Sequence, residues 1–381
     1  MQGHIYRRRK PDGTWSRWHA VIDLPTDSIG RRRQKTSTHE TKRDAQAWLA
    51  QLTQELRAGE VYDTKLTVAG FLIGWLEGRQ SLRPSTRQAY QAHLAQHLLP
   101  ELGHLRLVDL RSHHIEEMYR RITDGNPRRE RLVGPTTMRR IHATLNSALN
   151  TAVRRGLIRR NPATTVDLPR PSPVAASAWT SEEVATFLAA VHDDHLAVLY
   201  RLLVLTGLRR GEAVGLRWSD LDLPGGTLTV RRQVVSVAGE LIMGPPKSEA
   251  GRRTVALDEG TVELLRLRHR RDRIGHWAST DEDFDDTLVF RRSNGHGVHP
   301  AYVSRHFTTL VAQHGLRPIR LHDLRHTSAS IGLAAGESLL EVSRRLGHSS
   351  TAITADIYSH DSPATAAESA KRLASLIEDA I

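Results

Sequence analysis

The sequence predicts a multidomain, mainly α-helical protein. We expect a small three-stranded β-sheet plus one helix, then a helical domain, then a mostly helical α+β domain with a small antiparallel sheet. The chain has 381 residues, more than one ordinary hydrophobic core holds. Apolar residues recur at three- and four-residue spacing through most of the chain after residue 64, which is typical of amphipathic helices. A proline-rich stretch precedes the last domain, so we expect domains at residues 1–63, 64–163 and 179–381, with a linker at 164–178.

The first domain is predicted from two weakly alternating runs, residues 2–10 and 14–22, which a Pro-Asp-Gly turn separates. Residues 31–38 follow as a third strand. Thr41 is then a capping residue for a helix over residues 41–57. The result is a three-stranded sheet with one helix.

Basic side chains gather on the strands of this sheet, with Tyr6, Trp15 and Trp18 between them. A two- or three-stranded ribbon fits the DNA major groove, so we expect the sheet to bind DNA. A solvated basic surface on a minor domain is the alternative. The candidate DNA-binding residues are Arg7, Arg8, Arg9, Arg17, Arg31, Arg32, Arg33 and Lys35.

The second domain is predicted to be helical. Its expected helices span residues 67–76, 84–98, 112–122 and 135–154. Pro84 and Pro135 stand in the first turns, where a missing amide costs nothing. Arginine on a helix is ordinarily solvated, but the excess of arginine over acids here favours phosphate contact. The candidate DNA-binding residues are Arg128, Arg129, Arg139, Arg140 and Arg155.

Positive charge is unevenly distributed along the chain. Residues 1–172 contain 30 Lys and Arg against 16 Asp and Glu, whereas residues 173–381 contain 24 against 26. Arginine-rich codon usage would not by itself produce this asymmetry. A polyanion is the natural partner of the basic part, and we expect nucleic acid rather than a membrane because no basic amphipathic surface helix stands out.

Composition also excludes several classes of protein. The chain has no cysteine, which excludes disulfides, a thiol nucleophile and Cys-type zinc sites and fits a reducing cytoplasm. No apolar run approaches the roughly 20 residues of a membrane span. The N-terminus lacks the apolar region of a signal peptide, so we expect a cytoplasmic protein.

The third domain is predicted to combine helices with a few short strands. The linker before it is rich in proline, which keeps it extended and semi-rigid. Expected helices start at Thr180 and Gly211, span residues 196–205, 258–273, 299–314 and 338–346, and run from Arg325 to a stop at Gly336. Expected strands span residues 227–235, 240–243, 252–257 and 288–290.

A set of residues in this domain indicates a phosphate-handling site with a nucleophile. Arg209 stands at a helix junction, His322 and Arg325 are three apart on a predicted helix, and His348 follows a helix stop. A guanidinium offers phosphate two parallel hydrogen bonds. Tyr358 follows ten positions after His348. A single histidine or tyrosine is more often a surface or packing residue than a catalytic one, but the combination of these residues is specific to a catalytic site.

Lys247 lies in a turn between two predicted strands and is one of six lysines against 48 arginines. Lysine can lose its proton when its pKa is lowered, which arginine effectively cannot. We therefore interpret Lys247 as a general acid; the alternative is a lysine that occurs in the turn by chance.

Glu212 is expected to orient Arg209 or to cap the helix that follows it. His322 and His326 have a zinc-like spacing, but an arginine lies beside them and no third ligand is placed, so we expect no metal.

The chain resembles the phage-integrase family of tyrosine recombinases in an ordered set of motifs. These are Thr206-Gly-Leu-Arg209-Arg-Gly-Glu212, Pro246-Lys247-Ser, His322-Asp-Leu-Arg325-His-Thr, Leu346-Gly-His348 and Tyr358. The resemblance covers residues 175–362 and includes all six active-site positions expected of the family. The N-terminal half resembles the family's arm-type and core-binding DNA-binding domains more loosely.

The resemblance implies a site-specific DNA strand transferase that works through a 3′-phosphotyrosine and needs no cofactor. Its catalytic residues would be Arg209, Lys247, His322, Arg325, His348 and the nucleophile Tyr358, with Glu212 in support. The implied partners are double-stranded DNA attachment sites, a homotetramer on DNA, a DNA-bending host factor and an excisionase. The implied role is integration and excision of a phage or other mobile element in a bacterial nucleoid.

Two other functions stay open. One is a catalytically silent DNA-binding regulator on the same scaffold, and the other is an enzyme like a type IB topoisomerase. The complete set of site residues argues against the first, and the separate N-terminal sheet argues against the second.

The pattern of residues 364–381 predicts an amphipathic helix at the end of the chain, which packs either on its own domain or on a neighbouring copy.

Overall fold

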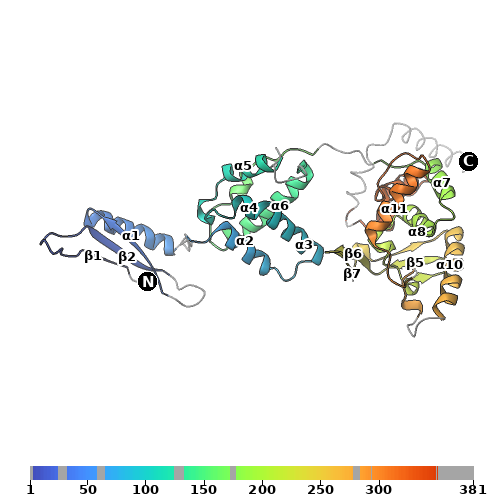
Figure 1. Ribbon diagram of the computed structural model, residues 1–381, viewed down its shortest axis with the longest axis horizontal. Helices are drawn as coiled ribbons and strands as arrows, with labels where there is room; N and C mark the ends of the chain where they lie inside the picture. The colour runs from blue at the N-terminus through green and yellow to red at the C-terminus, as the bar shows by residue number, and fades with distance from the viewer. Residues whose placement is uncertain are drawn as a thin grey trace, which may run out of the picture. The chain divides into compact units, whose positions relative to one another are not determined.

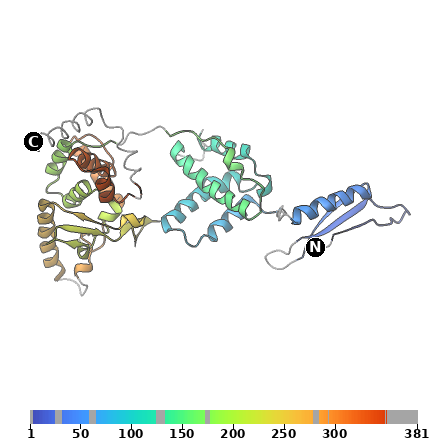
Figure 2. The same ribbon diagram turned by 180° about the vertical axis from the view of Figure 1, so that it is seen from behind.

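The structure is a computed structural model. It describes residues 3–24, 32–57, 65–123, 133–171, 177–277, 284–292, 294–348 and 350. The chain divides into two compact units, Met1–Ser172 and Pro173–Ile381 (Figures 1 and 2). Among the described residues, no helix is both long enough and apolar enough to cross a membrane. The predicted fold class, mainly helical with small antiparallel sheets, is confirmed.

The first unit begins with a three-stranded antiparallel sheet and one helix, as predicted. Its elements are β1 (Gly3–Tyr6), β2 (Trp18–Leu24), β3 (Arg33–His39) and α1 (Lys42–Arg57), with strand order β1-β2-β3. The Thr41 hydroxyl accepts a hydrogen bond from the Asp44 amide at the start of α1. Ile22 and Leu52 are the buried centre of a small core between sheet and helix. Strand β1 is shorter than the predicted run, which continues only as an isolated bridge between Arg9 and Trp15.

The rest of the first unit is helical. Its principal helices are α2 (Val68–Glu77), α3 (Pro84–His93), α4 (Leu99–Leu102), α5 (Ser112–Thr123) and α6 (Pro135–Arg154). Pro84 and Pro135 each occupy the first helical turn. The predicted helix over residues 84–98 is α-helical only as far as His93 and then passes through a π-helical turn at Leu94–Leu98. Apolar faces of these helices enclose a core that includes the fully buried Trp75.

The helices of the second unit are arranged around α8. They are α7 (Ser181–Ala190), α8 (Ala197–Thr206), α9 (Arg210–Ala213), α10 (Glu259–Trp277), α11 (Pro300–Gln313), α12 (Asp323–Ala334) and α13 (Leu339–Leu346). In α8 the side chains of Leu199, Tyr200 and Leu202 are completely buried. Helices α10 and α12 both pack against α8. Because α8 is held on several sides, its C-terminal end is a fixed point from which the following residues emerge.

The strands of the second unit form two sheets rather than one. The first has the order β4-β5-β8, from β4 (Leu221–Asp222), β5 (Thr227–Val230) and β8 (Arg253–Ala256), and the second is the hairpin of β6 (Gln233–Val237) with β7 (Glu240–Gly244). The predicted strand over residues 227–235 is therefore divided. Val230 pairs with Arg253, whereas Gln233 pairs with Gly244, so the chain changes partners at the two intervening arginines. The predicted strand at 288–290 is reduced to an isolated bridge from Leu288 to Arg217.

Helix α13 ends in a Schellman motif. Gly347 has the left-handed φ of +68°, its amide donates to the Arg344 carbonyl, and the His348 amide donates to the Ser343 carbonyl. A Cβ at Gly347 would lie 2.7 Å from the Ala250 carbonyl oxygen. The end of α13 thus lies directly against the loop that enters β8.

We predict that Gly347→Ala destabilises the protein more than Gly315→Ala does. Gly315 has a similar φ of +64°, but a Cβ there would meet nothing within 4 Å. Gly315→Ala should therefore show only the left-handed backbone cost of about 1–2 kcal/mol. Gly347→Ala adds a backbone clash worth a further ~1–3 kcal/mol. Calorimetric unfolding of the full chain measures both, and equal losses would contradict the close packing of Gly347.

Candidate active site

Arg325 lies in the first turn of α12 and is 5% exposed. Its Nη1 donates to the Gly207 carbonyl at 2.5 Å and its Nη2 to the Leu346 carbonyl at 2.6 Å. Gly207 follows α8 and Leu346 ends α13, so both acceptors belong to helix C-termini, where carbonyls lack intrahelical partners and favour cations. Arg325 therefore joins three helices at one point.

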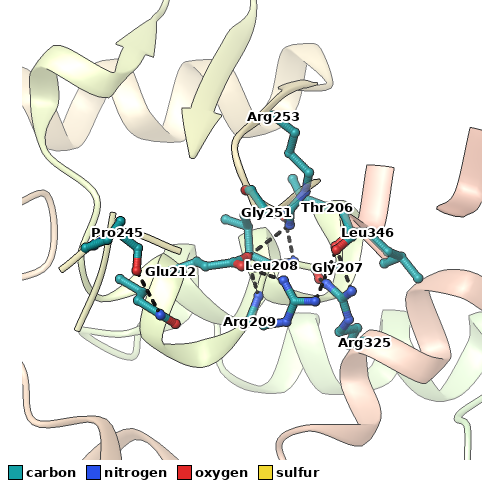
Figure 3. A network of polar contacts seen from close by, with 12 residues as sticks. Thr206, Gly207, Leu208, Arg209, Glu212, Pro245, Gly251, Arg253, Arg325 and Leu346 are labelled. Carbon is teal, nitrogen blue, oxygen red and sulfur yellow. Dashed lines mark hydrogen bonds and ion pairs between the residues drawn. The ribbon is translucent and has the colours of Figure 1, made fainter. Parts of the chain in front are cut away.

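Arg209 stands before α9 and is held by Glu212 in the same short segment. The Glu212 carboxylate accepts hydrogen bonds from the Arg209 amide at 2.9 Å and from its Nη1 at 2.7 Å. Arg209 Nη2 reaches the Gly347 carbonyl at 3.2 Å. The structure thus brings Arg209 and Arg325 together at the end of α13, as Figure 3 shows.

Glu212 is a buried carboxylate with two arginine partners. Its side chain is 0% exposed, and Arg253 Nη2 donates to it at 3.0 Å from the side opposite Arg209 (Figure 3). Burial acts to raise the pKa of Glu212, but the charge and hydrogen bond of Arg253, together with the bonds from Arg209, hold that pKa below its usual value. The carboxylate is therefore ionised and fixes both guanidiniums.

Three successive carbonyls at the end of α13 each accept a hydrogen bond from a different arginine. The Arg345 carbonyl accepts from Arg253 Nε at 2.6 Å, and the next two accept from Arg325 and Arg209. The Schellman bonds use the carbonyls before them, which leaves these three for other donors. The helix end consequently gathers one arginine from before α9, one from β8 and one from α12 into a cluster.

The histidines of the candidate site flank this cluster. His322 is the residue before α12, in a turn that the buried Asp323 carboxylate stabilises by accepting three hydrogen bonds from Arg320. Burial, then the neighbouring His326 and Arg325, lowers the pKa of His322. Burial and the charges of Arg325 and Arg209 lower the pKa of His348 to about 4. Both imidazoles are thus neutral near pH 7, so each ring has one donor and one acceptor nitrogen.

A groove of about 870 Å³ opens beside this cluster, and Arg209, His322 and Arg325 are among its lining residues. Arg209, Arg253 and Arg325 carry three positive charges against the one negative charge of Glu212, so the four groups have a net charge of +2. Fixed cations around a partly open groove stabilise an anion and any further negative charge that develops on it. The arrangement suits a phosphodiester.

The remaining predicted site residues lie differently. Lys247 is exposed in the loop between β7 and β8, and Tyr358 lies outside the described residues, as do residues 364–381. Arg253 and Asp323 contribute to the site although no sequence motif singles them out. The signal for Arg253 was its place at the start of a predicted strand, directly after the loop of Lys247.

The predicted DNA-binding residues are mostly at the surface. Those that the structure describes as exposed are Arg7, Arg8, Arg9, Arg17, Arg32, Lys35, Arg139, Arg140 and Arg155; Arg33 lies in β3, and Arg31, Arg128 and Arg129 are outside the described residues. Arg7 stacks on Trp15 and Trp18. Arg32 makes a two-pronged ion pair with Asp23. Neutral aromatic partners leave the charge of Arg7 more available to a polyanion than the carboxylate leaves that of Arg32.

One group of possible metal ligands occurs within the described residues. Asp194, His195 and His306 place their ligand atoms within 4.8 Å of one another. The Asp194 oxygens already lie 2.8 Å from His306 Nε2 and 3.4 Å from His195 Nδ1. These contacts tie α11 to the turn before α8. His322 and His326, whose rings are 5.5 Å apart, are not part of such a group in the described structure.

Comparison with protein families gives three matches along the chain. Residues 178–365 match the Phage integrase family, residues 4–56 an Arm DNA-binding domain, and residues 67–122 the Phage integrase N-terminal SAM-like domain. Among curated proteins, the chain is 25% identical to "Tyrosine recombinase XerC-like" of Caldanaerobacter subterraneus subsp. tengcongensis, over 91% of this chain and 93% of the relative. It is 28% identical to "Putative prophage phiRv2 integrase" of Mycobacterium tuberculosis, over 95% and 94%.

Solved structures share the fold. The Tn1549 transposon integrase in complex with transposon right end DNA aligns with a TM-score of 0.68 at 21% identity, covering 81% of this chain and 100% of that one. A lambda integrase tetramer bound to a Holliday junction aligns with a TM-score of 0.55 at 20% identity, covering 91% and 96%. The chain therefore shares its fold with these two integrase structures.

We predict that acidification destabilises the protein partly through His348. Because the folded state holds the pKa of His348 at about 4, below the ordinary 6.5, the unfolded chain takes up a proton first as the pH falls between these values. Stability present above pH 6.5 is thus lost toward pH 4. His348→Gln should flatten this part of the melting-temperature profile, whereas His314→Gln, at an exposed position, should not. Parallel profiles for wild type and His348→Gln would contradict the prediction.

Proposed function

The chain belongs to the phage integrase family and is a tyrosine site-specific recombinase, and on that premise we propose that it cuts and rejoins DNA through a 3′-phosphotyrosine formed on Tyr358. The observation that carries the proposal is the convergence of Arg209 and Arg325 on the end of α13, beside an open groove. Two preorganised guanidiniums suit a phosphodiester whose non-bridging oxygens gain negative charge during transfer.

The proposed reaction is a transesterification. The Tyr358 oxygen attacks phosphorus and loses its proton, the bond from phosphorus to the 5′ oxygen breaks, and Lys247 gives that leaving oxygen a proton. A 5′ hydroxyl of another strand then reverses the steps and releases the tyrosine. The phosphodiester bond energy is retained throughout, so the balance needs neither ATP nor a metal.

The histidines have two possible tasks in this scheme. His322 and His348 donate hydrogen bonds to the non-bridging oxygens, or one of them takes the proton of the attacking tyrosine. Their lowered pKa values support the neutral form, which can accept a proton. A tyrosine hydroxyl has an ordinary pKa of about 10, so its ionisation needs this cationic surrounding.

We further propose that the chain works as modules on DNA. Residues 1–63 would bind one class of site, and residues 64–163 would hold the core site together with residues 179–381. The family matches and the basic surface residues support this division. A homotetramer on double-stranded attachment sites is proposed by analogy with the lambda integrase tetramer on a Holliday junction. Residues 364–381 would dock on a neighbouring copy.

The proposed role is integration and excision of a phage or other mobile element in a bacterial nucleoid, with a DNA-bending host factor and an excisionase as further partners. The relative named as a prophage integrase and the structure of a transposon integrase support this choice.

We predict that Tyr358→Phe abolishes the covalent DNA adduct and leaves DNA binding within a few-fold, because only the nucleophilic oxygen is lost. A nicked suicide duplex that traps the adduct, read on a denaturing gel, measures the first effect, and a mobility-shift titration measures the second. Tyr302→Phe is the matched control, since Tyr302 contacts His195 on another part of the unit. An adduct that persists with phenylalanine would end the assignment.

We predict that Lys247→Ala slows cleavage of an ordinary phosphodiester by about 10²–10⁴-fold, the usual contribution of general acid catalysis. Cleavage of a 5′-bridging phosphorothiolate should be slowed far less, because the sulfur leaves without a proton. Single-turnover rates on both substrates make the comparison. Equal slowing on the two would remove Lys247 from the general-acid role.

A further inference from the structure

Arg253 is the one member of the arginine cluster that the proposed chemistry does not use. It is the first residue of β8, and its side chain is 7% exposed. Nη2 donates to Glu212 at 3.0 Å, Nε to the Arg345 carbonyl at 2.6 Å, and Nη1 to the Gly251 carbonyl at 3.0 Å. Unlike Arg209 and Arg325, Arg253 is not among the residues that line the groove. Its guanidinium, engaged in three directions, is therefore positioned to fix its neighbours rather than to meet DNA.

The three partners of Arg253 belong to three segments with proposed roles. Glu212 holds Arg209. The Arg345 carbonyl lies three residues before His348, at the end of α13. Gly251 closes the short 3-10 turn Glu249–Gly251 in the loop that carries Lys247. Arg253 therefore connects the phosphate-binding arginine, the histidine turn and the lysine loop.

The loop of Lys247 is anchored close to the lysine on both sides. Before it, the Pro245 carbonyl accepts a hydrogen bond from Gln233 at 3.0 Å, and Pro246 is buried. After it, Gly251 packs so closely on Pro246 that a Cβ on the glycine would lie 2.7 Å from the proline ring. Moving Gly251 would thus move Pro246 and the adjacent Lys247.

We propose that Arg253 is a positioning residue that sets the place of Lys247 relative to Arg209 and His348. The inference rests on the proposed role of Lys247 as general acid. A general acid must come within about 2.6–3.2 Å of the oxygen it protonates, and a displacement of 1 Å costs roughly 10²-fold in rate. An exposed lysine in a loop meets this requirement only if the loop is fixed to the groups that hold the phosphate.

The test uses Arg253→Lys in the full-length protein. The lysine retains a positive charge for Glu212, so the buried carboxylate stays paired, but one ammonium on a narrower stem cannot reproduce the three directed bonds of the guanidinium. We expect cleavage of an ordinary phosphodiester to slow by roughly 10²-fold, with DNA binding within a few-fold. The 5′-bridging phosphorothiolate should restore most of the rate. Arg252→Lys, at the exposed preceding residue, should leave both rates near wild type.

A second variant guards against a folding defect. By calorimetry, Arg253→Lys should melt near the wild type, because Glu212 keeps two cationic partners, whereas Arg253→Gln, which leaves Glu212 with Arg209 alone, should melt at a lower temperature. Adding Arg253→Lys to Lys247→Ala should slow ordinary cleavage little further than Lys247→Ala does, because both changes act on the same proton transfer.

The outcomes separate the inference from the function on which it rests. If Lys247→Ala is rescued by the phosphorothiolate and Arg253→Lys is slowed equally on both substrates, the positioning role of Arg253 is wrong and the general acid stands. If neither variant is rescued, the general-acid assignment fails, and the inference fails with it. Wild-type rates for Arg253→Lys on both substrates would also overturn the inference.

Discussion

The candidate site depends on the C-terminal end of α13, where three carbonyls have no hydrogen-bond partner within the helix. The Schellman motif that closes α13 uses the carbonyls of Ser343 and Arg344, and the next three carbonyls accept hydrogen bonds from Arg253, Arg325 and Arg209 in turn. Unpaired helix carbonyls carry partial negative charge, so they hold cations without neutralising them. This is why three guanidiniums can stand close together and still leave a net positive charge for an anion.

The buried carboxylate of Glu212 complements the helix end. A buried charge is costly unless it is paired, and Glu212 is paired on one side with Arg209 and on the other with Arg253. One carboxylate shared by two arginines fixes their directions while removing only one charge. The packed core around α8 also fixes Arg325, because Gly207 at the end of α8 supplies the second carbonyl acceptor of that arginine. Packing, hydrogen bonding and charge thus all specify one geometry.

Local sequence patterns predict most of the helices and strands, and the features they miss depend on contacts between distant parts of the chain. Proline at the first turn located α3 and α6, and Gly347 located the end of α13, because backbone conformation at those positions is a property of the residue itself. The division of the strand over residues 227–235 was missed because strand partners are chosen by tertiary context. Arg253 was missed for a related reason: its partners Glu212 and Arg345 lie 41 and 92 residues away in sequence, and no periodicity encodes contacts of that range. Residue type, position and family resemblance together predict Arg209 and Arg325, and only the structure shows what orients them.

The use of backbone carbonyls has a consequence for how the protein tolerates change. An acceptor that belongs to the main chain is present whatever side chain the residue bears, so substitutions at 345 and 346 cannot delete the acceptors of Arg253 and Arg325. A change that unwinds the last turn of α13 would remove them, and Gly347, with its positive φ, is the residue whose backbone conformation closes that turn. The hydrogen-bond acceptors therefore do not depend on the side chains at positions 345 and 346, but they do depend on the backbone conformation at Gly347. For engineering, the exposed positions of α13, such as Leu339 and Leu340, are the ones to vary, whereas Gly347 and the buried Leu346 should be kept.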